Sequence, residues 1–169
     1  IPLQHAHNAV LKSMRRTDTT EYIEEVIGKI RMRIPDVSLR TTFIVGFPGE
    51  TDSQYHALRN FIEKYRFDKV GVFTFSREEN TSAYNMPNQV PENVMQERYH
   101  DLMSVQSKIS EEINRSLENK VMDVLVEGHD AEQNNVVYGR SYREAPEVDG
   151  QIYVENAEQS EPGDIIKVK

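Results

Sequence analysis

The chain has 169 residues, of which 37% are hydrophobic and 28% charged, and its formal net charge at pH 7 is −8. No apolar run approaches the roughly 18–20 residues of a membrane-spanning helix, so we expect no membrane partner. The absence of cysteine excludes disulfides, thiolate nucleophiles and cysteine-held metal sites from these residues. The start, Ile1-Pro2-Leu3, resembles neither an initiator region nor a signal peptide, and we expect a piece of a larger cytoplasmic protein.

Two helices are predicted first, over residues 8–16 and 19–34, because apolar side chains recur there at spacings of three and four. Asp18 or Thr20 can cap the second helix. A strand is predicted over residues 37–46. Its continuous apolar end is typical of strands that are buried on both faces.

A third helix is predicted from Thr51, which forms a capping-box pattern with Gln54. A second strand follows over residues 70–75, and a polar loop over 76–90. Helix, strand, helix and strand at these spacings predict parallel strands joined by crossover helices, an α/β architecture.

A long helix is predicted over residues 92–117, and beyond it the apolar period changes from helical to two. Four short strands separated by Gly, Asn and Pro predict a small β-barrel; they are Val121–Glu127, Val136–Tyr138, Ile152–Val154 and Ile165–Val168.

Charge is unevenly distributed along the chain. Residues 1–115 hold 15 basic and 16 acidic side chains, whereas residues 116–169 hold 5 basic and 12 acidic ones. An acidic tail of this kind repels phosphate and suits a basic partner, which makes nucleic acid an unfavourable ligand for it. A solvated acidic surface that only aids solubility is the alternative.

The most informative stretch for binding is the segment 40–51, where Gly46 and Gly49 follow a buried parallel strand. Ligands bind at the carboxyl ends of such strands, and a backbone without Cβ atoms can approach them closely. An ordinary strand-to-helix turn is the alternative. His5 and His7 form a weak His-x-His pattern without further ligands, so no metal site is predicted. No catalytic residue is assigned.

Four motifs together resemble the radical S-adenosylmethionine methylthiotransferases: Pro2-Leu3-Gln4-His5-Ala6, Leu11-Lys12-x-Met14-x-Arg16, Ile44-Val45-Gly46-Phe47-Pro48-Gly49-Glu50-Thr51 and Phe67-Asp68-x-Val70-Gly71-Val72-Phe73. The resemblance runs essentially from end to end. The segment 139–150 is similar to the branch that attaches a methylthio group to the β-carbon of an aspartate in the twelfth small-subunit ribosomal protein.

The resemblance implies the second half of a TIM-like radical barrel with its bracing helix in residues 1–117. It implies a small OB-like TRAM barrel in residues 118–169. The parent enzymes use S-adenosylmethionine and two four-iron four-sulfur clusters. The family's CxxxCxxC motif is missing here, so this piece is expected to hold no cluster and to be inactive alone.

The family's binding residues transfer only in part. The resemblance implies S-adenosylmethionine contacts for Gln4 near the ribose, for Arg16 at the methionine carboxylate, and for the turn near the adenine, that is Ile44, Gly46, Gly49 and Glu50. Glu50 falls one position later than the usual family glutamate. Solvated helix charges are the alternative for Arg16 and Lys12.

The acidic tail is expected to contact the basic ribosomal protein, and four residues of one loop are the candidates: Tyr142, Glu144, Glu147 and Asp149. A loop that only closes the barrel is the alternative. Two other functions remain open, a methylthiotransferase acting on transfer-RNA adenosine and a non-catalytic protein-binding module. The negative tail disfavours the first of these.

Overall fold

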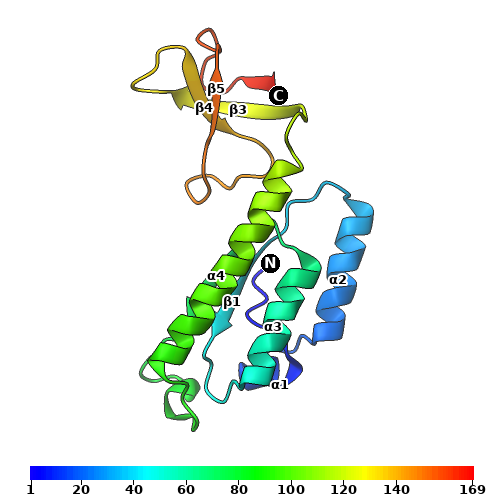
Figure 1. Cartoon of the computed structure of the whole chain (residues 1–169), viewed down its shortest axis with the longest axis vertical. Helices are drawn as coiled ribbons and strands as arrows, with labels where there is room; N and C mark the ends of the chain where they lie inside the picture. The colour runs from blue at the N-terminus through cyan, green and yellow to red at the C-terminus, as the bar shows by residue number, and fades with distance from the viewer. The chain divides into compact units, whose positions relative to one another are not determined.

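The computed structural model describes all residues, Ile1 to Lys169, and divides into two compact units. Unit 1 comprises Ile1–Asn114 and unit 2 comprises Arg115–Lys169. Unit 1 mixes helices with a short parallel sheet, and unit 2 is a four-stranded antiparallel sheet (Figure 1). The mixed α/β class predicted from the sequence is confirmed.

Unit 1 contains four α-helices, two strands and one 3₁₀ turn. In chain order they are α1 (Asn8–Ser13), α2 (Thr20–Arg33), β1 (Arg40–Val45), α3 (Asp52–Tyr65), β2 (Lys69–Thr74), η1 (Ser82–Asn85) and α4 (Glu92–Arg115). β1 and β2 pair in parallel, from Arg40 opposite Lys69 to Val45 opposite Thr74. Gln4 adds a parallel bridge to Phe43 on the other edge of β1. The parallel pairing follows from the crossover helix α3.

The helix ends follow local capping chemistry. Thr51 and Gln54 form the expected reciprocal capping box at the start of α3. Helix α2 differs from the prediction, because its N-cap is Thr19, whose hydroxyl accepts from the Tyr22 amide, and neither Asp18 nor Thr20. Helix α1 ends at Ser13, earlier than residue 16, because Arg15 turns into the left-handed region with φ 59°.

The core of unit 1 centres on Phe43, which is fully buried on β1. Its ring meets the edges of Phe61 and Phe67 at centroid distances of 6.4 and 6.0 Å. Leu58 of α3 and Leu102 of α4 are also fully buried in this cluster. The long helices therefore cover one face of the sheet, as Figure 1 shows.

The expectation that β1 is buried on both faces is wrong. Its residues alternate between buried and half-buried from Arg40 to Val45, with Thr41, Phe43 and Val45 on the buried side. The helices occupy only that side, so Thr42 and Ile44 face a space that no helix fills. A continuous apolar run cannot distinguish these two situations, because both faces carry apolar side chains.

Unit 2 has the four predicted strands: β3 (Met122–His129), β4 (Val136–Arg140), β5 (Ile152–Glu155) and β6 (Ile165–Val168). Their order in the sheet is β5-β4-β3-β6, and all pairs are antiparallel. The register shifts between Val126 and Gly128, which marks a β-bulge. Four valines of β3 and β4 are buried: Val124, Val126, Val136 and Val137.

Gly46 and Gly49 both have positive φ angles, 78° and 84°, but their surroundings differ. A Cβ on Gly46 would lie 2.2 Å from Met95 Cγ, whereas a Cβ on Gly49 would meet nothing within 4 Å. The space beside Gly46 is therefore occupied by the Met95 side chain of α4 and is not open to a ligand.

We predict that Gly46→Ala lowers the free energy of unfolding by about 2–4 kcal/mol, because backbone strain adds to a clash with Met95. Gly49→Ala should lower the free energy of unfolding by only about 1 kcal/mol, because it adds the cost of the left-handed backbone but no clash. Urea titrations of both variants followed by circular dichroism provide the comparison. Equal losses would contradict the proposed packing of Met95.

Candidate functional site

A hollow of about 640 Å³ lies on the sheet face that the helices leave uncovered. Its walls come from the segment that carries Gln4, from the end of α1, from β1 and β2, and from the loop that follows β2. The lining residues are Gln4, Ser13, Met14, Arg15, Arg16, Thr42, Ile44, Phe47, Phe73, Thr74, Phe75, Ser76, Thr81, Ser82 and Ala83. Its size is that of a small-molecule site.

The charged residues that line this hollow are all basic. Two arginines, Arg15 and Arg16, are its only charged lining residues, and no carboxylate lines it. Hydroxyls of Ser and Thr supply hydrogen bonds, and aromatic side chains such as Phe47 and Phe75 supply flat apolar surface. A ligand that combines a flat ring with a carboxylate or another anion fits this lining.

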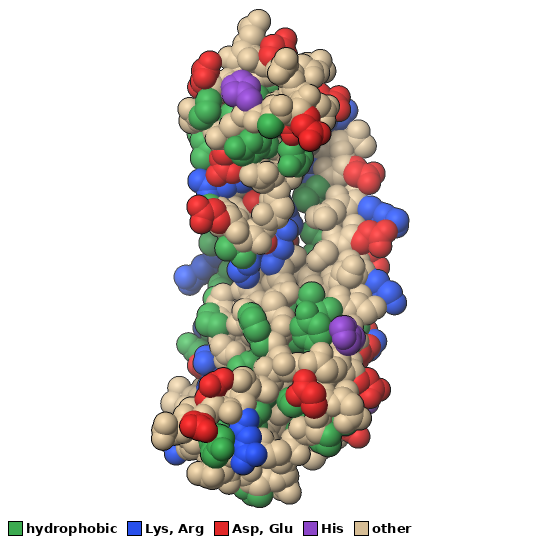
Figure 2. Space-filling view, turned by 90° about the vertical axis from the view of Figure 1, so that its left-hand side faces the viewer, with side chains coloured by type: hydrophobic (Ala, Val, Ile, Leu, Met, Phe, Trp, Pro, Cys, Tyr) green, Lys and Arg blue, Asp and Glu red, His purple; other side chains and the backbone are tan.

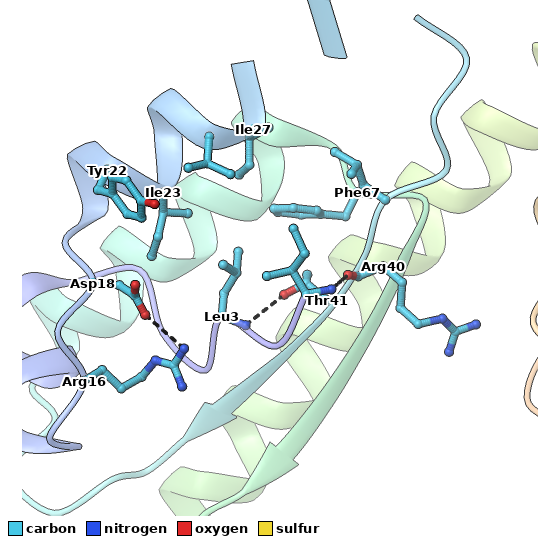
Figure 3. Close-up of a pocket in the computed structure, with 12 residues that line it drawn as sticks. Leu3, Arg16, Asp18, Tyr22, Ile23, Ile27, Arg40, Thr41 and Phe67 are labelled. Atoms are coloured by element: carbon cyan, nitrogen blue, oxygen red, sulfur yellow. Dashed lines mark hydrogen bonds and ion pairs between the residues drawn. The ribbon is translucent and has the colours of Figure 1, made fainter. Parts of the chain in front are cut away.

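Arg16 lies between two cavities. Its guanidinium forms an ion pair with Asp18 at 3.0 Å. Its Nε is buried and has no hydrogen-bond partner, which is unusual for a buried N–H donor. Besides the hollow, Arg16 also lines an apolar pocket of about 90 Å³. In Figure 3, Arg16 and Asp18 face one another at the edge of that pocket, beside Leu3 and Ile23. Arg16 therefore retains unused donor capacity for an acceptor.

Gln4 is held in a strained backbone conformation at the floor of the hollow, with φ 69°. Its amide donates to the Thr42 carbonyl at 2.9 Å, and its carbonyl accepts from the Ile44 amide at 2.8 Å. Positive φ is uncommon for residues other than glycine and asparagine, and such strain is concentrated at functional sites. The two β1 bonds lock Gln4 into this position.

A buried ionic cluster holds the turn after β1. Glu50 Oε1 lies 3.0 Å from His5 Nε2, and Glu50 Oε2 lies 2.8 Å from an Arg98 nitrogen and accepts from the Gly46 amide. The side chains of His5 and Glu50 are fully buried, and that of Arg98 is 6% exposed. Arg98 also pairs with Asp52 at 2.6 Å. One carboxylate thus joins three segments of unit 1.

The hydrogen bonds of His5 define its tautomer. Nδ1 accepts from the backbone amide of His7 at 3.0 Å, so the ring proton must be on Nε2, which donates to Glu50. Both ring nitrogens are therefore used inside the protein. The His7 ring accepts from the Ala9 amide at the start of α1. The structure contains no group of three or more side chains positioned to hold a metal ion.

A second contact between α3 and α4 lies beside this cluster. The Tyr55 hydroxyl donates to the Asp101 carboxylate, and the Arg98 guanidinium lies 5.3 Å from the centroid of the tyrosine ring. Burial raises the pKa of Tyr55, and the hydrogen bond to Asp101 raises it further. Tyr55 is therefore a neutral donor, and this contact supports the helix that carries Arg98.

Three of the six cofactor-binding candidates come together in the hollow, namely Gln4, Arg16 and Ile44. The other three do not line it. Gly49 and Glu50 line a separate hollow of about 480 Å³, and Gly46 packs against Met95. The Glu50 carboxylate is directed into the ionic cluster, so its visible role is to hold the turn.

Sequence reasoning missed Arg15, Asp18 and Arg98. Arg98 could have been noticed, because it lies three residues after Met95 and four before Leu102, on the apolar stripe of α4. A charge on such a stripe requires a buried partner. No sequence signal identified Arg15, since a basic residue at the end of a short helix is ordinary.

In unit 2, three candidates line one hollow of about 520 Å³: Glu144, Glu147 and Asp149. Tyr142 does not line it and is 61% exposed. Glu144 accepts from the amide and hydroxyl of Ser141, and Asp149 accepts from the Ala145 amide at 2.8 Å. These two carboxylates stabilise the loop itself, whereas Glu147 forms no hydrogen bond or ion pair within the chain and stands in a left-handed conformation, with φ 61°.

Comparison with known proteins identifies the class. Residues 1–62 match the radical SAM superfamily, and residues 120–169 match the TRAM domain. The chain belongs to the radical S-adenosylmethionine methylthiotransferase family, as the sequence motifs indicated. No helix of the structure is both long and apolar enough to cross a membrane.

The particular relatives share one name. The chain is 47% identical over 169 residues to the ribosomal protein uS12 methylthiotransferase RimO of Syntrophotalea carbinolica. It is 48% identical over 168 residues to that of Caldanaerobacter subterraneus, and 44% identical over 169 residues to that of Geobacter sulfurreducens. These alignments cover 99–100% of this chain but only 37–38% of the relatives' length.

We predict that Glu50→Gln lowers the free energy of unfolding by about 3–5 kcal/mol, because it leaves the buried Arg98 without a full counter-charge. Asp52→Asn should have a much smaller effect, since its side chain is 87% exposed. Urea unfolding at pH 7 measures both. A small loss for Glu50→Gln would show that the buried cluster does not stabilise the fold.

Proposed function

We propose that this chain is part of a radical S-adenosylmethionine methylthiotransferase that modifies an aspartate of the twelfth small-subunit ribosomal protein, at its β-carbon. The observation that carries this proposal is the 44–48% identity to proteins of that name along essentially the whole chain. A cytoplasmic location follows from a ribosomal substrate.

Unit 1 is, in this proposal, the second half of a TIM-like barrel, and unit 2 is an OB-like TRAM barrel, divided near residue 117. The parallel pair of β1 and β2 supports the first part, because one face of the pair is packed by helices and the other lines a hollow. The antiparallel order β5-β4-β3-β6 and the bulge in β3 are compatible with a small curled barrel.

The residues of the hollow fit S-adenosylmethionine. Arg16 would bind the methionine carboxylate, because it has a buried, unpartnered Nε and is oriented by Asp18. Gln4 would lie near the ribose, and Ile44 would contact the adenine. When bound, this cofactor supplies the radical and methyl chemistry of the family. Gly46, Gly49 and Glu50 would act by holding the turn beside the hollow.

The residues of this chain do not fit an iron–sulfur cluster, because cluster ligation needs thiolates and the sequence has no cysteine. The two four-iron four-sulfur clusters of the parent enzyme would need ligands outside these residues. No reaction step is therefore assigned to unit 1 alone.

Unit 2 would contact the basic ribosomal protein. Residues 116–169 carry 12 acidic and 5 basic side chains, and acidic and apolar side chains share the surface of unit 2 (Figure 2). Tyr142, Val148 and Tyr153 are each at least 60% exposed on or beside the acidic loop. Apolar anchors among acidic groups suit a protein partner rich in lysine and arginine, whereas phosphate would be repelled.

We predict that anaerobic reconstitution of the 169-residue chain with iron and sulfide yields no stoichiometric cluster and no cleavage of S-adenosylmethionine. The reason is the lack of thiolate ligands. Iron and sulfide analysis with visible absorption provides the measurement. A stable cluster at one equivalent would refute the statement.

The substrate assignment is tested with unit 2 in the intact chain. Affinity for the ribosomal protein should decrease as salt rises, because charge attraction is screened. Glu147→Lys should weaken binding about two- to fivefold without unfolding the loop, since its carboxylate has no partner within the chain. Glu158→Lys, the same charge change outside this loop, is the control.

Fluorescence anisotropy over a salt series gives the affinities of both variants. Equal losses for Glu147→Lys and Glu158→Lys would indicate a diffuse charge effect and would remove the loop from the contact surface. Tight binding of transfer RNA, without binding of the ribosomal protein, would overturn the proposed substrate.

A further inference from the structure

Arg15 occupies a position at which helices usually place glycine. The Arg16 amide donates to the Leu11 carbonyl at 2.9 Å, and the Arg15 amide donates to the Lys12 carbonyl at 3.0 Å. These two bonds form a Schellman motif that closes α1, and Arg15 is its left-handed residue, with φ 59°. A side chain at this position is strained, because its Cβ crowds the backbone.

Other left-handed residues in the chain show what offsets such strain. Four of them are asparagines, which tolerate this conformation well. Arg66 ends α3 in the same conformation, and its guanidinium pairs with Glu112 at 2.7 Å. Arg15 is exposed, and its side chain forms no ion pair or hydrogen bond within the chain. The structure thus holds a free guanidinium in a strained position at the wall of the hollow.

The hollow contains a positive charge without a counter-charge. Arg16 already faces Asp18, but Arg15 faces no carboxylate, and no acidic residue lines the cavity. The aromatic and aliphatic lining lowers the local dielectric, so a carboxylate that enters needs a cation beside it. The proposed reaction brings two carboxylates here, that of the methionine group and that of the target aspartate.

We propose that Arg15 binds the carboxylate of the acidic side chain that the enzyme modifies, while Arg16 binds the cofactor. This inference rests on the proposed function. Arg15 would then select aspartate over asparagine, because a guanidinium pairs with a carboxylate through two charge-assisted hydrogen bonds and has no acceptor for an amide. It would also orient the β-carbon towards the cofactor end of the hollow.

The test uses the full-length enzyme that carries this chain, and S-adenosylhomocysteine is present at a saturating concentration only when peptide binding is measured. Three variants are compared with the wild type: Arg15→Gly, Arg15→Lys and the control Arg66→Gly, which removes another left-handed arginine outside the hollow. Calorimetry measures the affinity for S-adenosylhomocysteine. Anisotropy measures the affinity for a peptide of the ribosomal-protein loop with its aspartate, and for the same peptide with asparagine.

Arg15→Gly should raise the melting temperature by about 2–4 °C, because glycine relieves the strain. It should weaken binding of the aspartate peptide about tenfold to hundredfold and abolish the preference over asparagine. The affinity for S-adenosylhomocysteine should stay within about twofold. Arg15→Lys should restore part of the preference, and Arg66→Gly should leave both affinities unchanged.

Two results would overturn the inference. If Arg15→Gly weakens the binding of S-adenosylhomocysteine and keeps the preference for the aspartate peptide, Arg15 binds the cofactor. If neither affinity changes, its side chain serves no ligand. A wild-type enzyme that binds neither peptide would instead refute the proposed substrate. The wild-type measurement therefore tests the proposed function, and the variants test the role of Arg15.

Discussion

Unit 1 depends on a single buried carboxylate. Glu50 accepts hydrogen bonds from His5, Arg98 and the Gly46 amide, which come from the amino-terminal segment, α4 and the turn after β1. An ionised group without water is costly unless every lone pair is used, and here the partners satisfy it. Because these partners lie far apart in sequence, the cluster fixes the turn, the segment carrying Gln4, and α4 in one arrangement.

The one-sided sheet explains why a hollow exists. Helices pack against Phe43 and its neighbours, and the opposite side of β1 keeps Thr42 and Ile44 accessible. The strained backbone at Gln4 and Arg15 places two polar side chains at the boundary of that space. Packing and hydrogen bonding in the remainder of unit 1 offset this local strain, as is common where a protein holds a binding surface ready.

The hollow of unit 1 and the surface of unit 2 differ in charge. The hollow of unit 1 is lined by two arginines and no acid, whereas unit 2 has a large excess of acidic residues. Electrostatics favours cationic groups at unit 2 and an anionic group in the hollow.

Local chemistry determined much of this protein. Apolar periodicity predicted the helices and strands, the Thr51–Gln54 pattern predicted the start of α3, and the motifs around Gly46 predicted the family. These signals are short-range or depend on residue identity, so the sequence carries them by itself. The same holds for the charge asymmetry and for the lack of thiolates.

Only the tertiary structure determined which groups the charged side chains pair with and which face of the sheet the helices cover. That Glu50 turns inward to Arg98, that Met95 fills the space at Gly46, and that Arg15 has no partner are all long-range facts. The sequence around a carboxylate does not distinguish one that faces a ligand from one that pairs with a buried arginine. Its role is set by which segments fold against it, because burial and charge pairing depend on distances that sequence spacing does not encode.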